Sequence, residues 1–235
     1  MYIYENKNWP SFEWDDSQVI TLLSEVRRKQ GELLGKMSSV GFELRGVAEL
    51  NTLTEEIQKS SSIEGEILSK NQIRSSMARK MQLNLQGLVE SSREVDCVVE
   101  IVYDAVENYK DSLTTKRLFK WHKLLFPYQD RFQKIDIGKW RVDTTGPMQV
   151  VSGALGMEVV HFQAPHSDKV NKEMKQFLSW VNKGDDIDPV LKAGIAHFWF
   201  VTIHPFEDGN GRLGRVITEM LLARADKTSE RFYSM

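Results

Sequence analysis

The sequence has one cysteine and few of the residues that break regular structure. Its 235 residues include 15 glycines and 6 prolines, which excludes collagen-like and linker-like chains. The single cysteine, Cys97, excludes a disulfide framework, and its apolar neighbours favour a structural thiol over a nucleophile. The first residues lack a signal-peptide pattern, and no stretch approaches the roughly 18 apolar residues of a membrane span. We therefore expect a cytoplasmic protein with no membrane partner.

The chain also lacks an excess of charge of either sign. It carries 31 basic and 33 acidic residues, for a formal net charge of -2. A strongly basic surface, which would suggest nucleic-acid binding, is therefore not expected in this chain. Hydrophobic residues make up 41% of the sequence, which is enough to form a core and excludes an intrinsically disordered chain.

Most of the chain has helical periodicity. Start signals and apolar spacing predict helices that begin at Asp15 or Asp16, near residue 42, at Ser69 with capping-box spacing, after Ser92, at Thr114, near Asp168, at Asp188-Pro189 and near Gly211. Two apolar runs around a turn at about residues 152–157 predict one β-hairpin. The first of its strands contains Met148, Gln149, Val150 and Val151. The fold class is therefore mainly α with one hairpin, which must lie against helices or a ligand.

The stretch 201–215 carries the most chemical information. Pro205 disfavours helical geometry at His204, so an apolar helix should end there and a new one should start after a short turn. Gly209 and Gly211 allow the backbone to approach a ligand closely. The free amides of the new helix would then form an anion site.

Charged side chains in the same stretch fit a polyphosphate. Arg212 and Arg215 are three residues apart and should project from one face of the first turn. Two guanidinium groups beside free amides fit a polyphosphate better than they fit a single phosphate group. Asp208 offers a hard oxygen ligand for Mg²⁺, and His204 can take up a proton near neutral pH.

Two other readings of this stretch are weaker. Gly209, Gly211 and Gly214 also spell G-x-G-x-x-G, but the dinucleotide-binding fingerprint needs a preceding strand and a following βαβ unit. A purely structural role, with His204 capping a helix and solvated arginines, leaves the grouping of base, acid, amide and arginines unexplained.

The remaining histidines suggest no second site. His197 and His204 are seven residues apart, and the sequence has no HExxH motif or cysteine pair, so a zinc site is not expected. His122, His161 and His166 are interpreted as ordinary surface or hairpin residues.

The segment His204-Pro205-Phe206-Glu207-Asp208-Gly209-Asn210-Gly211-Arg212-Leu213-Gly214-Arg215 resembles the Fic signature H-P-F-x-[D/E]-G-N-G-R-x-x-R at every specified position. The resemblance covers roughly residues 90–235, including the hairpin, which is similar to the family's flap over the active site. It implies a Fic-type helical bundle that transfers AMP from ATP to a protein hydroxyl.

The resemblance also implies roles for individual residues. His204 would be the general base acting on a Ser, Thr or Tyr hydroxyl of the target protein. Asp208 would bind Mg²⁺, and Phe206 would anchor the loop in the core. The phosphates of ATP would be held by Gly209, Asn210, Gly211, Arg212 and Arg215.

A second motif resembles the family's inhibitory pattern [S/T]-x-x-x-E-[G/N]. Ser60, Glu64 and Gly65 stand at its defined positions. In members with this pattern the glutamate pairs with the second motif arginine, here Arg215. The resemblance therefore implies an autoinhibited protein adenylyltransferase.

The resemblance leads to an expected division of the chain. Residues 1–88 would form a helical regulatory region and residues 89–235 the catalytic core, truncated at its C-terminal end. The target protein is not encoded in any recognisable motif, and the chain itself and a homodimer are candidate partners. Other Fic reactions, including phosphate or UMP transfer and removal of AMP, stay open, as does a nucleotide-sensing module with little turnover.

Overall fold

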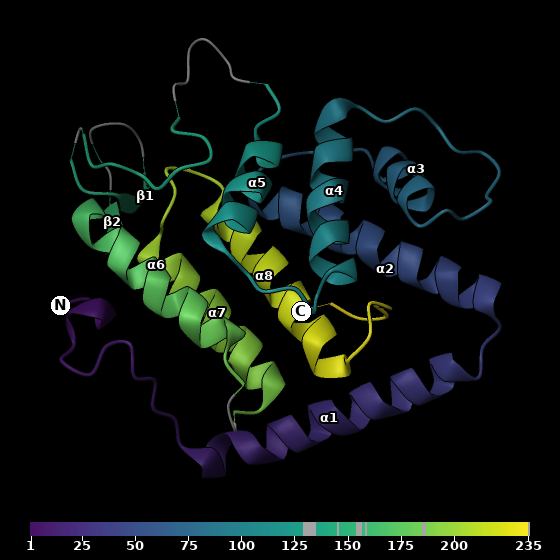
Figure 1. Cartoon of the computed structure of the whole chain (residues 1–235), viewed down its shortest axis with the longest axis horizontal. Coiled ribbons are helices and arrows are strands. Elements are labelled where there is room, and N and C mark those ends of the chain that lie inside the picture. Colours follow the sequence, from purple (N-terminus) through teal and green to yellow (C-terminus); the bar gives the residue numbers. More distant parts are fainter. Residues whose placement is uncertain (129–134, 145, 154–156, 158, 185–186, 235) are drawn as a thin grey trace.

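Eight α-helices and one antiparallel hairpin make up the described part of the chain (Figure 1). The computed structural model describes residues 1–128, 135–144, 146–153, 157, 159–184 and 187–234. The helices are α1 (Asp16–Ser38), α2 (Phe42–Ile63), α3 (Lys70–Lys80), α4 (Arg93–Glu107), α5 (Thr115–Leu125), α6 (Ser167–Asn182), α7 (Pro189–Ile203) and α8 (Asn210–Asp226). The expected mainly helical class with one hairpin is confirmed.

Side-chain caps begin several helices where the sequence predicts them. Asp15, Ser92, Thr114 and Asp188 each accept a hydrogen bond from a backbone N–H in the first turn of α1, α4, α5 and α7. The capping box expected at Ser69 is wrong: α3 begins there, but no side-chain cap bond forms at Ser69 among the described residues.

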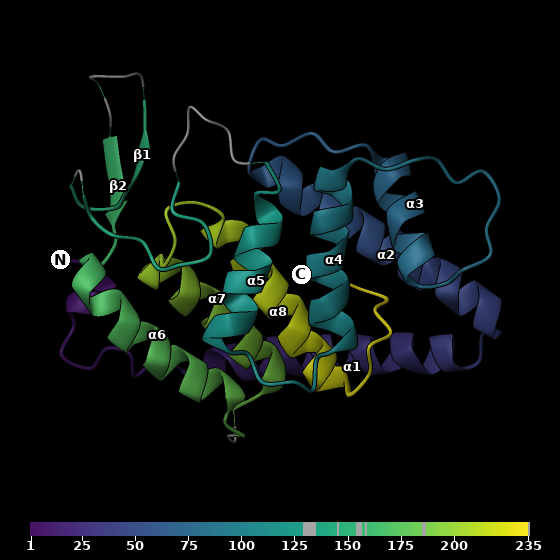
Figure 2. The ribbon, with the colours of Figure 1, turned by 45° about the horizontal axis from the view of Figure 1, so that its top comes forward.

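The hairpin pairs β1 (Gln149–Ser152) with β2 (Val159–Gln163). It stands clear of the helices near the start of α6 (Figure 2). The register shifts between Val150 and Val151, so the ladder has an irregularity beside the predicted turn. Part of that turn, residues 154–156 and 158, lies outside the described residues. Met148 precedes β1 and accepts a hydrogen bond from the Ala164 N–H at 2.9 Å.

The centre of the fold is the antiparallel pair α7 and α8. Helix α7 is apolar around most of its circumference, and most residues of α8 are buried, which places both helices inside the bundle rather than on its surface. The buried side chains of α2 join the same core: Leu50, Leu53 and Ile57 are at most 1% exposed. The core is therefore continuous across residue 88.

The segment after α8 is tied back by buried charges. The Arg231 guanidinium is fully buried and pairs with Glu219 at 3.1 Å and with Asp226 at 2.9 Å. The Tyr233 hydroxyl accepts a hydrogen bond from Gln30 of α1 at 2.6 Å. These contacts attach α1 to α8.

Two sequence-based expectations concern thiol chemistry and membranes. Cys97 is half-buried, and burial raises the pKa of its thiol, which fits a structural residue. Within the described residues, no helix is both long enough and apolar enough to cross a membrane.

We expect Leu50→Ala to destabilise the whole bundle, because Leu50 lies in the shared core. The free energy of unfolding should fall by about 2–5 kcal/mol in a single transition, measured by urea denaturation. Leu44 lies on the same helix but is 68% exposed, so Leu44→Ala should change it by less than about 0.5 kcal/mol. An equal effect of the two substitutions would contradict the packing of α2 described here.

Candidate active site

The site is built where the chain reverses between α7 and α8. His204 follows the last residue of α7 and has φ 51° and ψ 59°, a left-handed conformation that is uncommon outside glycine. Pro205 then prevents the helix from continuing. Burial lowers the pKa of His204, so its imidazole is neutral at pH 7.

The ring of His204 has a defined tautomer. Nδ1 lies 3.2 Å from the carbonyl oxygen of Val201. Because a carbonyl oxygen can only accept, Nδ1 carries the proton and Nε2 carries the lone pair. His204 can therefore accept a proton at Nε2.

The turn itself is closed by Asn210. Its side-chain oxygen accepts a hydrogen bond from the Phe206 N–H at 2.9 Å, and its amide nitrogen donates to the Phe206 carbonyl at 2.8 Å. Asn210 is 2% exposed, and Phe206 is fully buried. The Asn210 side chain thus holds the loop, and its role toward a phosphate stays a prediction. The buried ring of Phe206 agrees with the expected anchor.

His122, which the sequence analysis assigned to the surface, packs against the loop between α7 and α8 and forms a hydrogen bond to it. His122 is fully buried and stacks on Phe206 with 4.0 Å between ring centroids. Its Nδ1 accepts from the Gly138 N–H at 2.9 Å, so Nε2 donates to the Asp208 carbonyl at 3.1 Å. Burial lowers the pKa of His122 to about 4. The surface interpretation was wrong because the partners of His122 come from distant parts of the sequence.

Helix α8 begins at the two glycines, as the sequence predicts, and anion binding by its first amides stays a prediction. Gly209 caps the helix with φ 78°, and Gly211 lies in its first turn. A Cβ at position 211 would overlap Oε1 of Glu64, so the glycine leaves room for that carboxylate over the first turn of α8. An acidic group thus already lies beside the amides that would attract an anion.

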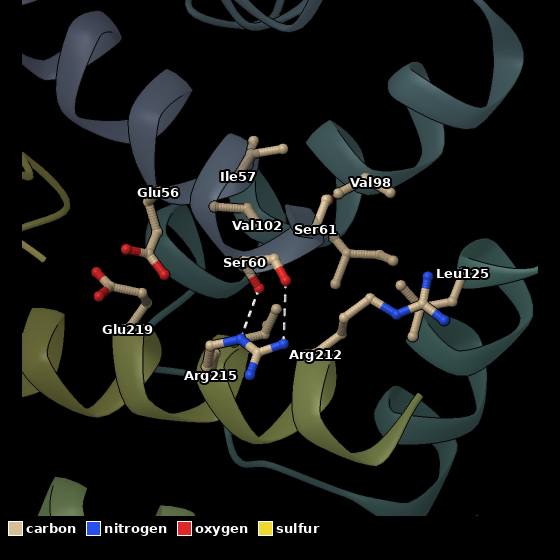
Figure 3. Close-up of a pocket in the computed structure, with 12 residues that line it drawn as sticks. Glu56, Ile57, Ser60, Ser61, Val98, Val102, Leu125, Arg212, Arg215 and Glu219 are labelled. Atoms are coloured by element: carbon tan, nitrogen blue, oxygen red, sulfur yellow. Dashed lines mark hydrogen bonds between the residues drawn. The ribbon is translucent and has the colours of Figure 1, made fainter. Parts of the chain in front are cut away.

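Both motif arginines are paired with acidic side chains that follow α2. The Arg215 guanidinium donates to Glu64 Oε1 at 2.7 Å, to the Ser60 hydroxyl at 2.7 Å and to the Ser60 carbonyl at 3.1 Å. The Arg212 guanidinium donates to Glu66 Oε1 at 2.5 Å. Figure 3 shows Arg215 reaching toward Ser60, while Arg212 runs toward Leu125.

The space between α2, α4 and α8 is narrow at this point. A cavity of about 20 Å³ remains beside the arginines and is lined by apolar side chains of α2 and α4 together with polar and charged ones such as Glu56 and Glu219 (Figure 3). The Arg212 Nε and the Ser61 hydroxyl are buried and have no hydrogen-bond partner among the described residues.

Gly65, the last residue of the inhibitory pattern, has φ 80° and follows the end of α2. Its left-handed conformation favours the glycine found there.

Asp208 is exposed on the same loop, and one of its oxygens accepts the Gly209 N–H at 2.6 Å. Among the described residues, no three His, Cys, Asp or Glu side chains gather as a metal site. A lone carboxylate with free coordination capacity fits Mg²⁺, which is commonly held by one or two carboxylates together with substrate phosphates and water.

The hairpin borders a groove that ends at His204. The groove has a volume of about 470 Å³, and its lining includes Val150 of β1, Phe162 of β2 and Phe198 of α7. Val150 and Val151 are both more than 40% exposed, so the hairpin presents apolar side chains to solvent, where a ligand could contact them. The hairpin therefore lies on the same groove as His204, and its role as a flap stays a prediction. The Gln149 side chain donates to Gln163 across the ladder.

One residue of this site was missed by the sequence analysis. Arg141 is 2% exposed and lies under the loop, where its Nε donates to the His204 carbonyl at 2.7 Å. Its backbone N–H donates to the Pro205 carbonyl at 3.0 Å. No local pattern marks an arginine between two loops as buried, so no signal in the sequence points to this residue.

Comparison with known proteins agrees with this geometry. Residues 112–222 match the Fic/DOC family, and residues 2–83 match a domain of unknown function (DUF4172). The chain therefore contains a Fic/DOC family domain, which α5 to α8 and the hairpin build.

Curated relatives include the protein adenylyltransferase Fic of Aedes aegypti, 26% identical over 217 residues, and that of Culex quinquefasciatus, 28% identical over 215 residues. The alignments cover 89% and 87% of this chain but 40% of each relative. A Fic family protein from Desulfovibrio desulfuricans has the same fold, with a TM-score of 0.60 and 24% identity over 92% of this chain and 59% of that one.

We expect His122 to make stability depend on pH. The unfolded chain takes up a proton near the ordinary pKa of 6.5, whereas the folded protein resists it down to about 4. Stability should therefore fall as the pH drops from 6.5 to 4, by up to about 1.4 kcal/mol per unit from this residue. His122→Gln should flatten that slope in urea denaturation at a series of pH values. An unchanged slope would show that His122 does not resist protonation.

Proposed function

We propose that this protein is a protein adenylyltransferase, which transfers AMP from ATP to a hydroxyl of a target protein. The observation that carries the proposal is the neutral, half-buried His204 beside the first turns of α8, where Arg212 and Arg215 project. The curated relatives named protein adenylyltransferase support the same reaction.

The groups of the site can account for a displacement at phosphorus. His204 Nε2 takes the proton of the acceptor hydroxyl as the acceptor oxygen forms a bond to the α-phosphorus. The bond from the α-phosphorus to its bridging oxygen breaks, and pyrophosphate leaves. The amides of Gly209 and Gly211, with the two arginines, would bind the phosphates and balance their charge.

A magnesium ion bound with the nucleotide would neutralise phosphate charge and orient the leaving group. Asp208 is the residue we assign to hold it, because its carboxylate is exposed next to the first turn of α8. His122 donates a hydrogen bond to the backbone carbonyl of Asp208, which fixes the position of the backbone that carries this carboxylate.

The acceptor hydroxyl has a route to His204 along the hairpin groove. A two-stranded sheet leaves edges open, so an extended segment of the target could pair with β1 and lie in the groove. Exposed Val150 and Phe198 would contact its apolar side chains. The target is then a protein segment that presents Ser, Thr or Tyr at His204.

We further propose that Glu64 keeps the enzyme inactive. Its carboxylate lies over Gly211 and bonds Arg215, so it occupies both anion-binding features that a polyphosphate would use. Arg215 is also bound by Ser60, which holds its guanidinium toward α2. Productive binding of ATP would require Glu64 to leave.

We expect Glu64→Gly to increase AMP transfer. A hydrogen bond between charged groups contributes about 1.5–3 kcal/mol, so its loss should raise transfer about 10- to 100-fold. Incorporation of AMP from labelled ATP into the protein itself and into added candidate targets would measure the change, with product mass by mass spectrometry. Glu64 is the C-cap of α2, so glycine there should not interrupt the helix.

His204→Ala in the Glu64→Gly background is the matched control. It should lower transfer by about 10²–10⁴-fold and leave ATP binding nearly unchanged. Label that persists in the double variant would refute His204 as the base. No label in any variant, while ATP binds and the fold is intact, would favour a nucleotide-sensing module, and a product mass other than AMP would favour another Fic reaction.

A further inference from the structure

Arg141 connects three segments that meet at His204. It comes from the stretch before the hairpin, and it donates to the His204 and Pro205 carbonyls and to the carbonyl of Pro165, just after β2. Its guanidinium also pairs with Asp143, and these two side chains are 1% and 5% exposed.

Asp143 completes this connection on the other side of the hairpin. It accepts the Ser167 N–H of α6 at 2.7 Å, and its own N–H donates to the Ser167 hydroxyl at 3.1 Å. Burial raises the pKa of Asp143, but the Ser167 N–H and the Arg141 charge hold it below its usual value. Arg141 therefore has a partner that is ionised at neutral pH.

We propose that Arg141 is a positioning residue that holds His204 in its left-handed conformation and links the base of the hairpin to the reacting histidine. A non-glycine residue at φ 51° is disfavoured unless its surroundings fix it. The planar guanidinium can bind several carbonyls in fixed directions, which a lysine cannot do. The expected change in kcat rests on the proposed function, whereas the expected change in the titration of His204 does not.

The test compares Arg141→Met and Arg141→Lys in the Glu64→Gly background. Displacement of a catalytic group by about 1 Å can cost on the order of 100-fold, so both variants should lose kcat by roughly 10- to 100-fold while ATP affinity changes little. Lys139→Met removes a charge that is 59% exposed nearby and should leave transfer unchanged.

NMR titration of His204 gives a readout that does not depend on activity. Burial is the largest cause that lowers the pKa of His204, and the charge of Arg141 lowers it further. The charges of Asp208 and Glu64 raise it. The pKa should therefore rise in Arg141→Met and stay near its original value in Arg141→Lys. If Arg141→Met does not fold, Asp143→Asn should give a smaller loss of kcat in the same direction. Unchanged kcat and unchanged His204 titration in a folded variant would overturn the proposal.

A second observation concerns the other motif arginine. Arg212 is 6% exposed and donates to Glu66 Oε1 at 2.5 Å, and it lies over the Phe126 ring at 5.3 Å. Glu66 lies two residues beyond Glu64 but outside the inhibitory pattern. A buried guanidinium requires an anionic partner, and Glu66 supplies one among the described residues.

We infer that Glu66 is a second inhibitory carboxylate, which competes with phosphate for Arg212 independently of Glu64. Arg212 is closer than Arg215 to the start of α8, where the free amides lie. A shorter polyphosphate bound at those amides would meet Arg212 first, so it would displace Glu66 without reaching Arg215. This inference rests on the proposed nucleotide site.

Binding of ADP and ATP by calorimetry separates the two carboxylates. Glu66→Gln should raise the affinity for both nucleotides about tenfold, whereas Glu64→Gln, which frees Arg215 but keeps a side chain over Gly211, should raise the affinity for ATP more than that for ADP. Glu55→Gln, an exposed change on α2, should alter neither. Unchanged ADP affinity in Glu66→Gln, when Glu64→Gln binds ATP more tightly, would overturn the inference. Absence of binding in every variant would instead reject the nucleotide site.

Discussion

The double hydrogen bond between the Asn210 side chain and the Phe206 backbone sets the geometry of the whole site. It closes the reversal between two buried helices, so that His204 ends one helix beside the first turn of the other. The loop is short and Pro205, Phe206 and Gly209 are buried, so the backbone polar groups there need partners within the protein. His122 from α5 and Arg141 from the segment before the hairpin provide these partners. The loop that carries His204 is therefore held by hydrogen bonds from several elements without regular secondary structure of its own.

Electrostatics then governs what occupies the site. Two arginines lie in the first turns of α8, next to the N-terminus of the same helix. Their charges and the positive end of the helix dipole together attract anions. In this structure the anions are carboxylates of the chain itself, supplied just after α2. Internal carboxylates and external phosphates are alternative partners for the same cations, so the proposed inhibition and the proposed binding of ATP would compete for one set of charges.

The core makes this competition effective. Helix α2 does not pack as a detached appendage, because its apolar side chains join the same core as α4 and α8. Glu64 and Glu66 are thus held near the arginines by packing over the preceding turns of α2. Release would need local rearrangement after Ile63, where the helix ends and the chain becomes exposed.

Sequence by itself determined the elements and the chemical identity of the site. Local signals such as Asp188 before Pro189 marked helix starts, and the run from His204 to Arg215 supplied the candidate base, the candidate anion site and the family resemblance. Tertiary structure alone decided which distant groups reach that run. His122, Arg141 and Glu66 show no local periodicity or motif that marks their role, because burial and pairing depend on segments many residues away. Their contribution became visible only when the fold brought these segments together.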